Sequence, residues 1–81
     1  MSTKETCRSN IIRISANLAK EREQKKKDNE SYARQIAAAK TPERKAALRK
    51  DKLNRAAVHD IRINQMKRDL EQVRRYMRSL K

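Results

Sequence analysis

The sequence has no glycine, no tryptophan and no phenylalanine, and only one proline and one cysteine among its 81 residues. Tight turns with positive φ normally recruit glycine, so the absence of glycine argues against a β protein built from hairpins. The single cysteine, Cys7, cannot form a disulfide within the chain, which excludes a fold held by internal disulfides. No apolar stretch resembles a signal peptide or reaches membrane-spanning length, so we expect an intracellular, reducing location, the cytoplasm.

Large apolar side chains are also scarce, with six isoleucines, five leucines, two valines, three methionines and two tyrosines. A chain this short buries little surface and is marginally stable alone. This composition suits an all-α single domain with thin contacts between helices, completed by a second chain. An alternative is that part of the helical order depends on a partner, because high net charge with low hydrophobicity is typical of disorder.

The clearest local signal is the pair Thr41-Pro42, which predicts the start of a helix. Threonine is a good N-cap residue, and proline is favoured at the first helical position. Thr41 precedes a proline and is therefore disfavoured in the α region, so a preceding helix should end before it. Glu43 then suits the positive end of the new helix dipole.

These signals divide the chain into a flexible N-terminal tail at residues 1–8, a helix at about 10–39, a turn at 40–41 and a helix at about 42–80. The joint between the helices is short, which favours an antiparallel, coiled-coil-like helical hairpin. A continuous helix kinked at the proline is the alternative.

The second predicted helix carries an a/d seam, because residues recur at alternating spacings of three and four over three and a half heptads. The seam residues are Ala56, His59, Ile63, Met66, Leu70, Val73, Met77 and Leu80. Only His59 among them is polar. It is either a pH-sensitive contact or a tolerated polar residue that sets the register, and we favour the second.

The segment 20–31 contains no apolar residue, and in a hairpin it would face residues 50–61. We therefore expect the two helices to pack well at the open end of the hairpin and near the turn, but weakly in the middle. The mismatch suggests that another chain completes the seam, for example as two hairpins in a four-helix bundle. Asp28 and Glu30, which lie within this run, are interpreted as solvated surface.

Acidic residues are few, since 23 lysines and arginines against ten acidic residues give a net charge of +13. Solubility alone requires a net charge of only about 2–8 in a small domain. One group of cations lies on the flank beside the seam: Lys67, Arg68, Arg74, Arg75 and Lys81. A second group follows the proline: Arg44, Lys45, Arg49, Lys50, Lys52 and Arg55.

The functional prediction is a binding protein, not an enzyme, because one histidine, one cysteine and no glycine-rich loop provide no catalytic set, cofactor motif or metal site. The leading hypothesis is that the basic face binds the nucleic-acid backbone, with little readout of sequence. The alternative is a helical adaptor or chaperone-like subunit of a larger assembly, which binds an acidic protein partner. A membrane surface is the weakest candidate, because the narrow seam lacks tryptophan and phenylalanine. Self-association or pairing with another helix is expected in either case.

Overall fold

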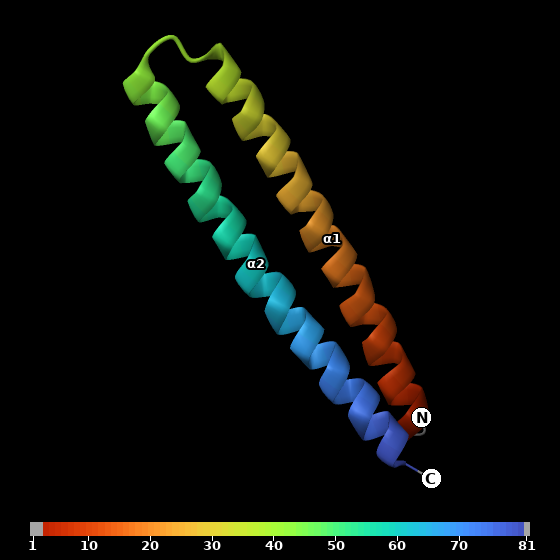
Figure 1. Ribbon diagram of the computed structural model, residues 1–81. Coiled ribbons are helices and arrows are strands. Elements are labelled where there is room, and N and C mark those ends of the chain that lie inside the picture. The colour runs from red at the N-terminus through yellow and green to blue at the C-terminus, as the bar shows by residue number, and fades with distance from the viewer. Residues whose placement is uncertain (1–2, 81) are drawn as a thin grey trace.

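The computed structural model describes residues 3–80, and these residues form two helices and no strand. Helix α1 spans Thr3–Ala38 and helix α2 spans Pro42–Ser79. The helices run side by side in opposite directions, so that both ends of the chain lie at the end opposite the turn (Figure 1). The molecule is a thin rod with extents of 62 × 14 × 13 Å. The all-helical class is confirmed, and the arrangement is a helical hairpin.

The turn forms as the Thr41-Pro42 pair predicts. Thr41 has extended backbone angles (φ −121°, ψ 147°), and its hydroxyl oxygen accepts a hydrogen bond from the Arg44 backbone N–H at 3.1 Å. Pro42 begins α2, where its missing N–H removes no helical hydrogen bond. The Ala39 N–H donates to the Ile36 carbonyl at 3.3 Å and closes the last turn of α1.

The N-terminal segment differs from the prediction, because α1 begins at Thr3 in place of the tail expected over residues 1–8. Residues 1–2 lie outside the described part of the chain. Cys7 is 4% exposed and packs between the helices. It lies four residues before Ile11 and seven before Ile14, so it extends the apolar face of α1 by one heptad and holds the first turns.

All eight predicted seam residues are buried or half-buried, and seven of them lie in α2, with Leu80 as its C-cap residue. His59, Ile63 and Leu70 are the most buried of them. The matching face of α1 also follows alternating spacings of four and three, and it continues through the polar run. Its members are Cys7, Ile11, Ile14, Leu18, Glu21, Lys25, Asp28 and Tyr32. Within the described chain, the seam therefore packs against α1, and charged side chains occupy the middle of the interface.

Candidate functional site

The middle of the hairpin contains a cluster of polar side chains around His59, which is 2% exposed. The ring nitrogen Nε2 lies 2.6 Å from Asp28 Oδ2, and Nδ1 lies 3.3 Å from Glu21 Oε1. Both carboxylates belong to α1 and lie seven residues apart, which is about two helical turns, so the histidine of α2 is held between them. We call His59, Glu21 and Asp28 the polar clasp.

Two arginines of α2 cover one rim of the clasp. Arg62 Nη1 donates to Glu21 Oε1 and Arg55 Nε donates to Asp28 Oδ2, each at 3.3 Å. Among the described residues, every buried side-chain nitrogen or oxygen has a hydrogen-bond partner. The Asp28 side chain is only 20% exposed, so its interpretation as solvated surface is wrong. The interpretation failed because Asp28 occupies a seam position inside a charged run, where no apolar neighbour marks it.

The same contacts lower the pKa of both carboxyl groups. Burial acts to raise the pKa of Glu21, but hydrogen bonds from His59 and Arg62 outweigh it and hold the pKa below its ordinary value. The hydrogen bond from His59 is the main cause of the lowered pKa of Asp28, with further hydrogen bonds from Gln24 and Arg55. Both groups are therefore held in the ionised form.

The opposite rim of the interface is defined by an ion pair of 2.6 Å between Lys25 Nζ and Asp60 Oδ1. Lys67 and Arg74 follow Asp60 at spacings of seven, so they lie along this same rim of α2. The two rims thus differ. On one rim, arginines pair with the clasp carboxylates. On the other rim, lysine and arginine continue along α2 beyond the Lys25–Asp60 ion pair.

The predicted stripe of cations on this flank is exposed to solvent. Lys67, Arg68, Arg74 and Arg75 are all exposed, and Lys81 lies outside the described residues. Arg75 Nε pairs with Glu71 Oε1 at 3.0 Å. Within residues 3–80, no carboxylate pairs with Lys67 or Arg74.

The structure divides the second predicted group of cations. Lys45 and Lys52 are half-buried on either side of buried Leu48, so they line the interface between the helices. Arg44 is exposed close to the turn. Arg49 and Lys50 are exposed and stand 18 residues before Lys67 and Arg68, which is about five full helical turns. They therefore extend the stripe along the same flank, although the sequence prediction treated the two groups of cations separately.

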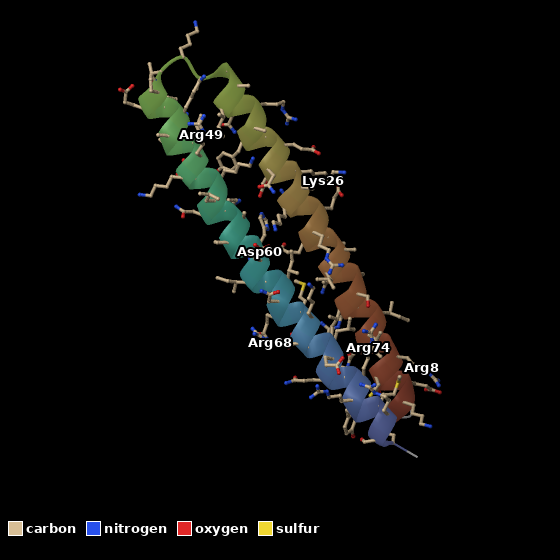
Figure 2. The ribbon with its side chains drawn as sticks, in the orientation of Figure 1. Arg8, Lys26, Arg49, Asp60, Arg68 and Arg74 are labelled. Atoms are coloured by element: carbon tan, nitrogen blue, oxygen red, sulfur yellow. The ribbon has the colours of Figure 1, made fainter. Side chains whose placement is uncertain are left out.

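We call this set the α2 row, and it comprises Arg49, Lys50, Lys67, Arg68, Arg74 and Arg75. Figure 2 shows Arg49, Arg68 and Arg74 distributed along the length of α2. The row is interrupted in its middle by Asp60, which is paired with Lys25, and near its end by Glu71. An extended anion could contact several of these cations together.

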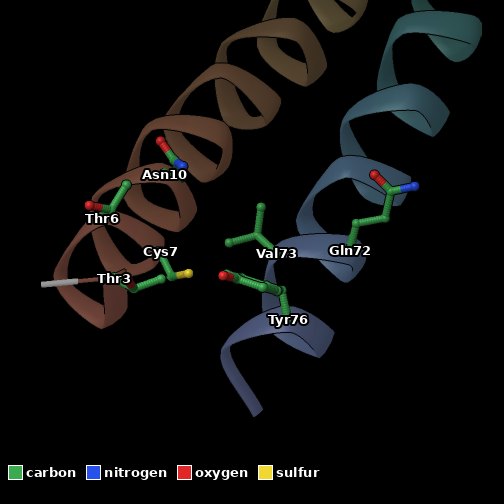
Figure 3. A pocket seen from close by; sticks show the side chains of 7 residues that line it. All are labelled: Thr3, Thr6, Cys7, Asn10, Gln72, Val73 and Tyr76. Atoms are coloured by element: carbon green, nitrogen blue, oxygen red, sulfur yellow. The ribbon is translucent and has the colours of Figure 1, made fainter. Parts of the chain in front are cut away.

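A small pocket of about 280 Å³ lies between the helices at the open end of the hairpin. Cys7, Val73 and Tyr76 approach one another across it (Figure 3), and threonine and amide side chains line its edge. Among the residues that the structure describes, no histidine or carboxylate lines this pocket.

No three histidine, cysteine or carboxylate side chains in the described chain are grouped so that they could hold a metal ion. In the clasp, the two carboxylates contact opposite nitrogens of one ring and do not converge with it on a common point. Neither helix, over the residues described, has a segment apolar and long enough to span a bilayer. Comparisons with protein-family models, with curated proteins and with solved structures found no match to the chain.

Proposed function

We propose that the protein is a non-enzymatic basic helical hairpin that binds nucleic acid through contacts of the α2 row to backbone phosphates. The observation that supports this proposal is the row itself. Lys67 and Arg74 are exposed, lie seven residues apart on one rim and are not paired with any carboxylate of residues 3–80. The net charge of +13 gives the whole rod a strong attraction for a polyanion.

The spacing of the row suits a phosphate backbone. Residues seven apart are separated by about 10.5 Å along a helix, which is roughly three base-pair steps of 3.4 Å. A straight helix laid along a duplex can therefore bring several cations near phosphates at once. The sequence has only two aromatic residues, Tyr32 and Tyr76, so stacking on bases does not contribute much, and we expect little sequence preference.

The alternative, a helical adaptor that binds an acidic protein, is favoured by one feature of the outer surface. Leu53 is 71% exposed and Ile61 is 68% exposed. They lie eight residues apart with Ala57 between them, so they share one face of α2. An apolar contact beside cations is what an acidic protein partner would use. Self-association into a bundle would use this outer face and not the seam, because the polar clasp of the same chain fills the middle of the seam.

The proposed function can be tested by fluorescence anisotropy with two labelled duplexes of unrelated sequence. We expect similar affinity for both duplexes and a linear fall of log affinity with log salt, each phosphate contact adding about 0.9 to the slope. The variant with Arg68→Glu, Arg74→Glu and Arg75→Glu should bind at least tenfold more weakly, without loss of helicity, because none of these positions lies in the seam.

Competition with polyglutamate separates the two functions. Polyglutamate at equal charge should displace the duplex poorly if phosphates are the target. No binding of the wild type to either duplex at low salt would refute the nucleic-acid function and favour the adaptor. Equal binding by the triple variant would refute the assignment of the α2 row.

A further inference from the structure

Helix α1 carries a second row of cations at regular spacing. We call it the α1 row, and it comprises Arg13, Lys20, Lys27 and Arg34. Its members recur every seven residues and all four are exposed. Glu23 and Glu30 lie on the same helix and reduce the local charge. Over residues 3–80, however, no carboxylate forms an ion pair with a member of the row.

The ion pairs of the interface determine which side of the rod the α1 row occupies. Glu21 pairs with Arg62 on one rim, and Lys25 pairs with Asp60 on the other. The step of four residues from Glu21 to Lys25 is a rotation of about 400° around the axis of α1, which is a full turn plus about 40°. A rotation in the direction of increasing residue number therefore leads from the Arg62 rim toward the Asp60 rim. Lys20 precedes Glu21 and is rotated by about 100° in the opposite sense, away from Asp60. The seven-residue spacing places the rest of the α1 row beside Lys20, beyond the Arg62 rim.

The two rows therefore face opposite sides of the hairpin, because the α2 row lies on the Asp60 side. The rod is 13–14 Å across its short axes, and this thickness separates the two rows. A straight duplex laid against one side therefore cannot also reach the cations on the other. The α1 row extends over about 32 Å and the α2 row over about 39 Å at 1.5 Å per residue. Each row is thus long enough to contact a separate duplex over roughly ten base pairs of 3.4 Å.

We propose that one hairpin bridges two nucleic-acid segments, with one duplex bound by the α1 row and a second bound by the α2 row. This inference rests on the proposed function, since it requires that the cations contact phosphates. It goes beyond that function because it assigns a second binding surface to α1, so that one hairpin would cross-link two duplexes. A protein with two basic sides also neutralises the repulsion between two duplexes that approach each other.

A co-capture experiment tests bridging by the full-length protein. A biotinylated duplex on beads and a free fluorescent duplex, each of about 20 base pairs to match the length of the rod, are mixed with protein at a lower concentration than either duplex. The wild type should carry the fluorescent duplex to the beads. Two variants matched in charge are compared with it. The first has Lys20→Glu, Lys27→Glu and Arg34→Glu, and the second has Arg68→Glu, Arg74→Glu and Arg75→Glu.

Each variant should still bind a single duplex through its remaining row, while co-capture falls at least tenfold. The α2 variant should bind that duplex at least tenfold more weakly than the wild type, because only the four cations of the α1 row remain, whereas the α1 variant keeps the six cations of the α2 row. Circular dichroism checks that the helices persist, and glutamine replaces glutamate at the same positions if they do not. No binding of the wild type to one duplex would overturn the proposed function and bridging together. Binding of one duplex without co-capture would overturn bridging alone. Full co-capture by the α1 variant would also overturn it, because a dimer would then be presenting two α2 rows.

Discussion

His59 and Asp28 join the two helices through a contact of 2.6 Å between Nε2 and Oδ2, at a place where the α1 sequence has no apolar residue. The other ring nitrogen faces Glu21 at 3.3 Å. The clasp therefore links α1 and α2 through polar contacts between one histidine ring and two ionised carboxylates.

The clasp predicts that His59→Leu destabilises the hairpin. The substitution leaves the carboxylates of Glu21 and Asp28 facing an apolar side chain, which should cost about 1–3 kcal/mol. In thermal unfolding followed by circular dichroism, each kcal/mol corresponds to roughly 4–8 °C in Tm. Arg62→Gln is the control, because this arginine is largely exposed and its loss should cost less than about 1 kcal/mol. A variant His59→Leu as stable as the wild type would contradict the role of the clasp.

Acid should weaken the hairpin through Glu21 and Asp28. Their pKa values are lower in the folded chain than in the unfolded chain, so the unfolded state takes up protons first as the pH falls. Their contribution is complete above the ordinary carboxyl pKa of about 4 and is lost as the pH falls through the lower, folded values. Tm should therefore decline in this acidic range. The variant with Glu21→Gln and Asp28→Asn should show a lower Tm at pH 7 and a shallower decline, and parallel curves would exclude these two groups as the cause.

The N-cap of α2 provides a local test of stability. Thr41→Ala removes the oxygen that accepts from the Arg44 N–H at 3.1 Å, and it should cost about 1 kcal/mol. Thr41→Ser keeps a hydroxyl group and should retain most of the stability. Urea denaturation of both variants measures the difference. Equal losses would show that the hydroxyl group does not cap the helix.

The seam can be tested with two leucines of very different exposure. Leu70 is 8% exposed and Leu53 is 71% exposed. Leu70→Asp places a carboxylate in the contact between the helices and should cost several kcal/mol, enough to unfold a small hairpin. Leu53→Asp adds the same charge to the outer surface and should leave helicity nearly unchanged. Circular dichroism of the two variants gives the comparison, and equal helicity would refute the assignment of Leu70 to the core.

Glu71 should limit the affinity of the α2 row, because it pairs with Arg75 at 3.0 Å and with Arg78 at 3.4 Å. Glu71→Gln frees both guanidinium groups for phosphate, so duplex affinity should rise severalfold and the salt dependence should steepen by up to about 0.9 per added contact. Asp51→Asn changes the net charge equally, at an exposed position outside the row. If both variants bind equally well, net charge alone sets the affinity.

The elements that depend on local chemistry were predictable from the sequence. Thr41 and Pro42 act through their own backbone preferences, and the apolar seam of α2 repeats over many turns. The interface in the middle was not predictable in the same way. Glu21, Lys25 and Asp28 occupy seam positions, but a search for apolar periodicity does not register them. Their positions become visible only when the heptad is continued from Ile14 and Leu18 through the charged run.

The position of Cys7 and the α1 row could also have been found from spacing. Cys7 precedes Ile14 by seven residues, yet a polar neighbourhood hid the continuity. The α1 row has the same period but no apolar residue in it, so it reads as ordinary surface. That it faces away from the α2 row depends on how α1 is rotated relative to α2. This rotation follows from the pairs Lys25–Asp60 and Glu21–Arg62 and not from the period of either helix.

The elongated shape affects how the molecule would behave in solution. Its radius of gyration is 18.3 Å, whereas a compact domain of this length would have about 12 Å. A rod of this kind diffuses more slowly than a sphere of equal mass and elutes early from a gel-filtration column. A single hairpin would thus be mistaken for a dimer by comparison with globular standards. Its stoichiometry, free or with duplex, should be determined by sedimentation equilibrium or light scattering, which measure mass independently of shape.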